Sequence, residues 1–171
     1  RRVLFRSAQL TLAGELYRSK PDLHVQSHLA ENLDEIAWVR SLFPEARDYL
    51  DVYDRHGLLG PRSIYGHCIH LSPAEAARMA ETGTAAAFCP TSNLFLGSGF
   101  FNHAAAVDAG IRVGLATDVG GGTSFSMLRT LDEAYEVSQV PRRPLPPLRA
   151  WFLATLGGAR ALYLDDCIGN F

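Results

Sequence analysis

Short apolar runs alternate with longer stretches of helical periodicity along most of the chain. The apolar runs predict four strands, at residues 23–28, 63–68, 85–90 and 112–117. Apolar positions that recur at helical spacing predict helices over residues 7–19, 33–43, 72–83, 100–110, 127–139 and 148–162. This alternation is typical of parallel strands covered by helices, so the sequence predicts an α/β protein of one domain.

One of the predicted helices carries both its start and its stop signal. Ser72 is a suitable N-cap, Pro73 fits the first helical position and Glu75 completes a capping box. Gly83 then ends the helix, because glycine readily adopts the left-handed conformation of a helix C-terminus.

Two architectures fit this order of elements. One is an open, doubly wound sheet, and the other is part of a (β/α)8 barrel. A complete barrel takes about 250 residues, so the 171 residues of this chain would hold only some of its units. The side chains at the carboxyl ends of the strands bear on the choice, because a barrel builds its active site there.

The composition excludes several classes of partner. The formal net charge of −2 and the lack of a run of Lys or Arg give no electrostatic footprint for nucleic acid. The apolar stretches stop well short of the ~20 residues that a membrane span needs, so no membrane partner is expected. The cysteines are odd in number and form no C-x-x-C (Cys68, Cys89 and Cys167), which argues against disulfides and a cysteine zinc site and favours a cytoplasmic protein.

Polar residues suited to catalysis follow each predicted strand. They are His28 with Glu31, then His67, then the segment 91–93, then Asp118. Taken singly, each has an ordinary structural explanation: a core histidine, an acid in the first turn of a helix, a loop histidine, an Asx turn. Their recurrence at successive strand ends favours a shared site at one face of the sheet.

Two other motifs do not predict a site. The run Gly120–Gly122 lacks the Lys and Ser/Thr of a phosphate-binding loop and reads as a tight turn. Cys89-Pro90 lacks the second cysteine of a cytidine-deaminase zinc site.

Four longer motifs resemble the second half of the guanine deaminases, a family within the amidohydrolase superfamily. The motifs are QSHLAEN (26–32), YGHCIHLSPAE (65–75), CPTSNLFLGSGF (89–100) and GLATDVGGGTSFSML (114–128). The resemblance extends over residues 8–171 and implies a (β/α)8 TIM barrel of the amidohydrolase type, of which this chain would hold strands five to eight. It also implies one zinc ion per chain, hydrolysis of guanine to xanthine and ammonia, and a homodimer.

The same resemblance implies roles for individual residues. His28 and Asp118 are the expected zinc ligands, from the fifth and eighth strands, and Asp118 also handles protons. Glu31 is the expected proton shuttle, and His67 the histidine that hydrogen-bonds the attacking water and the substrate. The residues expected to line the guanine pocket are His28, Leu29, Ala30, Glu31, His67 and Asp118.

The chain departs from the family pattern in three places. It contains no H-x-H pair, which supplies two further zinc ligands in the superfamily, and it stops at DDCIGNF, where the family continues into a small β-sandwich. We therefore expect residues 1–171 to form a single partial barrel domain that is inactive in isolation. At Arg1–Ser7 the match also fails, because Phe5 precedes Arg6 where the family has an Arg-Phe pair, so no role is assigned to Arg6.

Two alternative functions remain open from the sequence. The chain could belong to another aminohydrolase of the superfamily, with a purine, pterin or triazine substrate, because related barrels share metal ligands and differ in their pockets. It could also be a metal-free relative of these barrels that serves as a binding or scaffold protein.

Overall fold

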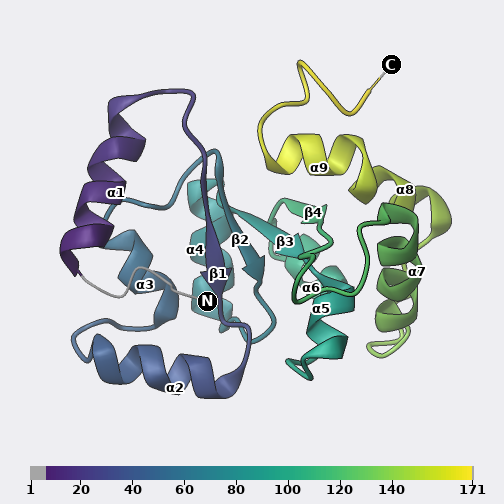
Figure 1. The fold of residues 1–171 in the computed structure, drawn as a ribbon, viewed down its shortest axis with the longest axis horizontal. Coiled ribbons are helices and arrows are strands. Elements are labelled where there is room, and N and C mark those ends of the chain that lie inside the picture. The colour runs from purple at the N-terminus through teal and green to yellow at the C-terminus, as the bar shows by residue number, and fades with distance from the viewer. Residues whose placement is uncertain (1–6, 171) are drawn as a thin grey trace.

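The computed structural model describes residues 7–170 and contains one sheet of four parallel strands (Figure 1). The strands lie in chain order: β1 (Val25–Leu29), β2 (Ser63–His67), β3 (Ala85–Phe88) and β4 (Val113–Leu115). A doubly wound sheet reverses its strand order at a switch point. The order here never reverses, which is the arrangement of consecutive units in a (β/α)8 barrel.

The helices follow the predicted alternation with two additions. Figure 1 shows the first three helices on one side of the sheet beside β1 and the last three on the other side beside β4. The helices are α1 (Ser7–Ser19), α2 (Leu33–Leu42), α3 (Tyr49–Asp54), α4 (Pro73–Thr82), α5 (Pro90–Phe95), α6 (His103–Asp108), α7 (Met127–Ser138), α8 (Pro147–Ala154) and α9 (Leu156–Ala161). Within residues 7–170, none of them is long and apolar enough to cross a membrane.

The two faces of the sheet differ in the size of their side chains. Large residues such as Leu29, Tyr65 and Phe88 belong to the main core between the sheet and its helices. On the opposite face, the register aligns His28 with Gly66, Gly66 with Ala87 and Ala87 with Gly114. Three residues without bulky side chains beside His28 leave open space on that face.

The start and stop signals predicted for α4 are confirmed. The Ser72 hydroxyl accepts a hydrogen bond from the Glu75 N–H (3.3 Å), and the Glu75 carboxylate accepts one from the Ser72 N–H (2.8 Å). Gly83 is left-handed, with φ of 74°. Glu75 also accepts a hydrogen bond from the Leu50 N–H (3.3 Å), so the predicted cap ties α4 to α3.

Several predicted elements differ in extent from those observed, and the strand expected over 112–117 spans only Val113–Leu115. The strand expected over 85–90 ends at Phe88, because Pro90 starts the short helix α5. The helix expected over 100–110 spans only α6, which Asn102 caps at its N-terminus. The helix expected over 148–162 divides at Thr155 into α8 and α9, where the backbone leaves the helical region (φ −126°, ψ −107°).

A buried carboxylate in α3 makes stability depend on pH. Burial on its own would raise the pKa of Asp51, but hydrogen bonds from Arg47 and Arg55 outweigh it and lower the pKa from 3.8 to about 2. Because the folded-state pKa lies below the unfolded-state value, this stabilisation is complete above pH ~4 and is lost as the pH falls towards 2. We expect Asp51→Asn in the intact protein to lower the free energy of unfolding by about 1–3 kcal/mol at pH 7.

Urea unfolding of the wild type and the variant at several pH values measures this effect. The difference in unfolding free energy should shrink as the pH falls from 4 to 2, since protonation removes the same negative charge. Asp22→Asn, at an exposed position, is the control and should change neither the stability nor its pH dependence. A difference that stays constant down to pH 2 would contradict the role assigned to Asp51.

Candidate metal and catalytic site

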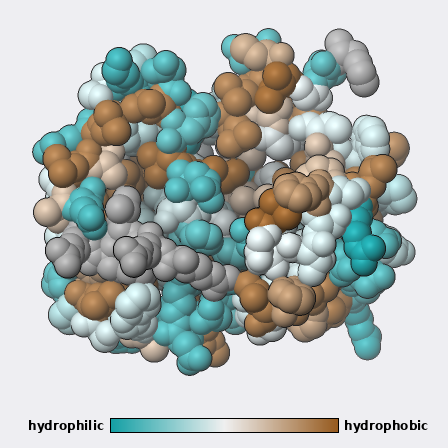
Figure 2. All heavy atoms as spheres, in the orientation of Figure 1, coloured by the Kyte–Doolittle hydropathy of each residue, from teal (hydrophilic) through white to brown (hydrophobic). Residues whose placement is uncertain are grey.

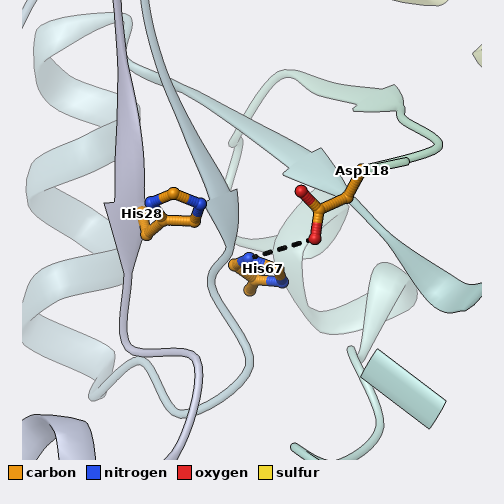
Figure 3. A group of neighbouring side chains, drawn as sticks. All are labelled: His28, His67 and Asp118. Atoms are coloured by element: carbon orange, nitrogen blue, oxygen red, sulfur yellow. Dashed lines mark ion pairs between the residues drawn. The ribbon is translucent and has the colours of Figure 1, made fainter. Parts of the chain in front are cut away.

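Three predicted site residues meet at the carboxyl ends of the strands (Figure 3). His28 lies near the end of β1, His67 is the last residue of β2, and Asp118 follows β4. Among the residues that the structure describes, these three form the group of potential metal ligands, with one ligand atom from each lying within 4.8 Å of the others. Figure 3 shows the Asp118 carboxylate directed towards the His67 ring.

His67 is fully buried and presents one ring nitrogen to two carboxylates. Its Nδ1 atom lies 2.8 Å from Asn93 Oδ1. Because an amide oxygen only accepts hydrogen bonds, this contact places the proton of a neutral imidazole on Nδ1 and leaves a lone pair on Nε2. Nε2 lies 3.7 Å from Glu31 Oε2 and 3.8 Å from Asp118 Oδ2.

The surroundings of this nitrogen fit a metal ion or an ordered water. Within residues 7–170, His67 Nε2 is buried without a hydrogen-bond partner. A buried polar atom normally has a hydrogen-bond partner, and a buried polar atom that lacks one needs an explanation. A metal ion, or a water that donates to Nε2, would serve as the partner here. Two imidazoles with a carboxylate are a ligand set that zinc accepts.

His28 is held in the protonation state that binds metals. Its ring stacks on that of His67, with centroids 5.3 Å apart and planes 15° apart. Burial lowers the pKa of His28, and the neighbouring His67 lowers it further, against the opposing effect of Asp118 and Glu31. The neutral imidazole that results is the form that coordinates metal ions. By contrast, burial raises the pKa of Cys89 to about 12, so its thiol stays protonated beside the site.

The backbone is strained where the strands lead into the site. Ala30, His67, Cys68 and Asp118 have positive φ values of 49°, 70°, 51° and 45°. Residues with a Cβ atom rarely adopt this region, and when they do it is often at functional sites. The predicted tight turn after Asp118 is confirmed: its carbonyl accepts from the Gly121 N–H (3.1 Å).

Glu31 is buried next to this group, with 1% of its surface exposed. Its backbone N–H donates to Glu35 Oε2 (2.9 Å), and Glu35 Oε1 accepts from the Tyr49 hydroxyl (3.2 Å). The Tyr53 hydroxyl donates to the His28 carbonyl (3.0 Å). Two tyrosines of α3 therefore brace the backbone that carries His28 and Glu31.

The bracing by Glu35, Tyr49 and Tyr53 was not predicted from the sequence. The spacing of Asn32 and Glu35 is that of a capping box, and Asn32 does accept a hydrogen bond from the Glu35 N–H (2.8 Å), so Glu35 had a detectable signal. Nothing in the sequence pairs it with Tyr49. Leu29 and Ala30 were expected in the substrate pocket, and the structure buries both in the main core.

A cavity of about 450 Å³ opens in front of the three clustered residues. Its lining includes His28, His67 and Asp118, together with the small residues Gly66 and Ala87. Small-molecule sites commonly measure about 300–1,000 Å³. Of the residues expected to bind substrate, Leu29, Ala30 and Glu31 are not among the described residues that line it, and Arg6 lies outside the described part of the chain.

Comparison with known proteins decides the family. The amidohydrolase family matches residues 5–171. The chain belongs to the amidohydrolase family. This amidohydrolase is 52% identical to the guanine deaminase of Escherichia coli (strain K12) over 163 residues, which cover 95% of this chain and 37% of that protein.

Two solved structures extend the comparison. A guanine deaminase from C. acetobutylicum with bound guanine is 32% identical to this amidohydrolase, with a TM-score of 0.90, over 96% of this chain and 40% of that one. An adenosine deaminase from Xanthomonas campestris with bound zinc is 30% identical, with a TM-score of 0.88, over 96% and 38%. The predicted resemblance to guanine deaminases is thus confirmed, and the four-stranded sheet is part of an amidohydrolase barrel rather than a doubly wound sheet.

Proposed function

We propose that the protein to which these residues belong hydrolyses guanine to xanthine and ammonia, with one zinc ion per chain. The observation that carries the proposal is the cluster of His28, His67 and Asp118, with Glu31 against His67 Nε2. The 52% identity to a guanine deaminase supports guanine as the substrate. The chain spans about 37% of the length of that relative, so the activity belongs to the intact protein.

We also propose how the intact protein is organised. Strands β1–β4 correspond to strands five to eight of the barrel, and residues 1–171 form a partial metal-dependent hydrolase domain. Further ligands come from the remainder of the barrel, since a catalytic zinc normally takes three protein ligands and one water. The complete enzyme acts in the cytoplasm as a homodimer, and residues 1–171 alone are inactive.

In this mechanism His28 and Asp118 would hold the zinc ion. When bound, zinc would lower the pKa of water to about 7 and so supply a nucleophile at neutral pH. His67 Nε2 accepts a hydrogen bond from the attacking water and orients it, a role that suits its lone pair and its lack of a partner among the described residues.

Glu31 and Asp118 move the protons. Glu31 accepts one proton as water attacks C2 of guanine and delivers it to ring atom N3. Asp118 passes the second proton to the amino group as the C–N bond breaks, so guanine and water give xanthine and ammonia. A carboxylate at hydrogen-bonding distance from the reacting atoms typically contributes about 10²–10⁴-fold to such proton transfers.

Deamination of another ring, a different purine, a pterin or a triazine, is the alternative function. The observation that favours it is the likeness to an adenosine deaminase with bound zinc, at 30% identity. Metal ligands are shared between such enzymes, so only the substrate range separates the two functions.

Kinetics of the intact, zinc-replete protein test the proposal. We expect guanine to give stoichiometric xanthine and ammonia with a kcat of about 1–10³ s⁻¹. We expect kcat/KM to be at least ~10²-fold lower for adenosine, a pterin and a triazine than for guanine. A pocket that hydrogen-bonds the polar edge of guanine would have polar groups left without partners when one of these other rings is bound. Removal of zinc by a chelator should abolish turnover, and re-addition should restore it. Turnover of another ring in preference to guanine, or activity that survives zinc removal, would refute the proposal.

A further inference from the structure

One loop reaches both Glu31 and His67. It begins with Asn93 in α5 and returns at Ser98, where the Ser98 N–H donates to the Asn93 carbonyl (2.8 Å). Both residues at its base are buried, with 1% of Asn93 and 8% of Ser98 exposed, whereas the residues between them are exposed. The buried base is therefore fixed against the site.

At one end of this base, Asn93 determines how the His67 ring is presented. The Asn93 Oδ1 atom lies 2.8 Å from His67 Nδ1. This contact anchors one ring nitrogen and directs the other, Nε2, towards Glu31 and Asp118. An imidazole that lost this partner could rotate about its χ2 angle or carry its proton on Nε2, which would then no longer accept a hydrogen bond from water.

At the other end of the base, Ser98 orients the side chain of Glu31. The Ser98 hydroxyl donates to Glu31 Oε1 (3.1 Å). The second carboxylate oxygen, Oε2, faces His67 Nε2 at 3.7 Å. In each of the two side chains, one polar atom is thus held by the loop while the other faces the reaction site.

His70 fastens the loop to the strand ends. Its Nε2 atom lies 3.0 Å from the Ser98 carbonyl, to which it donates. The backbone N–H of His70 donates to the Ala30 carbonyl (3.1 Å), which links this histidine to the exit of β1. Gly99 packs close above it, with φ of 130°, and a Cβ atom there would lie 3.1 Å from Ile69 Cγ2.

We propose that Asn93 and Ser98 are positioning residues for the deamination, and that His70 secures the turn that carries Ser98. This inference rests on the proposed function. Asn93 fixes the ring orientation and the tautomer of His67, and Ser98 fixes the Glu31 carboxylate so that Oε2 meets the attacking water. Neither residue belongs to the group of potential metal ligands or lines the cavity in front of it.

Kinetics of the intact protein with Ser98→Ala and Ser98→Thr test the contact with Glu31. Mutation of a hydrogen-bond partner that orients a residue of a metal site typically lowers activity by about 10–100-fold. We therefore expect Ser98→Ala to lower kcat by that factor. KM and zinc content should stay close to wild type. Ser98→Thr keeps the hydroxyl and should restore most of kcat. The matched control is Ser19→Ala, which removes an exposed hydroxyl bonded to the Leu16 carbonyl at the end of α1 and should change nothing in the kinetics.

A second measurement tests the contact with His67 and needs no turnover. In protein with ¹⁵N-labelled histidine, NMR reports which ring nitrogen of His67 carries the proton. In the metal-free intact protein we expect the proton on Nδ1, and in Asn93→Leu a mixture of the two tautomers. This result can be read even if guanine is not the substrate, so failure of the inference and failure of the proposed function are distinguishable.

Two outcomes would overturn the inference. One is an unchanged kcat in Ser98→Ala or an unchanged tautomer in Asn93→Leu. The other is a loss of kcat that Ser98→Thr does not rescue and that accompanies a matching loss of zinc or of melting temperature, because this pattern indicates a role in folding alone.

Discussion

Asp118→Ala in the intact protein is expected to lose both its zinc and its activity. The substitution removes one ligand and one proton carrier at once, so the zinc content should fall well below the one ion per chain of the wild type, and kcat should fall by at least ~10³-fold. His28→Ala should lose zinc to a similar extent but retain more activity when excess zinc is supplied, because His28 carries no proton in the mechanism. Metal analysis and kinetics at saturating zinc measure the two effects.

His67→Ala is the matched control for the metal measurement. His67 lies within 4.8 Å of both proposed ligands, yet we assign it to the orientation of water. It should therefore keep its zinc while kcat falls. Full zinc occupancy in both His28→Ala and Asp118→Ala would show that the ligands are assigned wrongly, and zinc loss in His67→Ala would make this histidine a ligand.

Glu31→Gln is expected to keep zinc and lose turnover. The glutamine amide has nearly the same size, and its oxygen can still accept the hydrogen bond from Ser98 that Glu31 Oε1 accepts at 3.1 Å. Only the capacity to carry a proton is removed, so kcat should fall by at least ~10²-fold. Glu45→Gln, at an exposed position, is the control and should behave as the wild type. A kcat near the wild-type value in Glu31→Gln would exclude Glu31 from the mechanism.

The regular elements were predictable where the hydrophobic pattern was long or sharply bounded. All four strands and α4 were found in this way. The helix α3 was not, because all residues from Tyr49 to Tyr53 are buried and so show no alternation between an apolar and a polar face. The helix α5 has only six residues and starts at Pro90, two residues after the end of β3, so Pro90 was assigned to the strand and residues 91–93 to the segment after it.

The site was predictable to the extent that parallel strands bring their carboxyl ends together. This rule alone placed His28, His67 and Asp118 on one edge, and the structure brings them within reach of one another. Contacts such as those of Ser98 and Tyr53 depend on the path of loops and on a short helix, for which the sequence carries no periodic signal. The roles of the clustered residues stay predictions until the variants are measured.

The positive φ values at the ends of β1 and β2 lower the stability of the fold while they fix the backbone beside the site. Ala30 and Cys68 each hold a positive φ that glycine adopts freely, and such strain costs about 1–3 kcal/mol per residue. A glycine at either position would relieve strain and at the same time loosen the backbone beside Glu31 or His67. A glycine also gives the unfolded chain more conformational freedom, and at Cys68 it removes a side chain that packs in the main core. The strain at these two positions therefore cannot be relieved by glycine without a cost in packing and in the fixed geometry of the site.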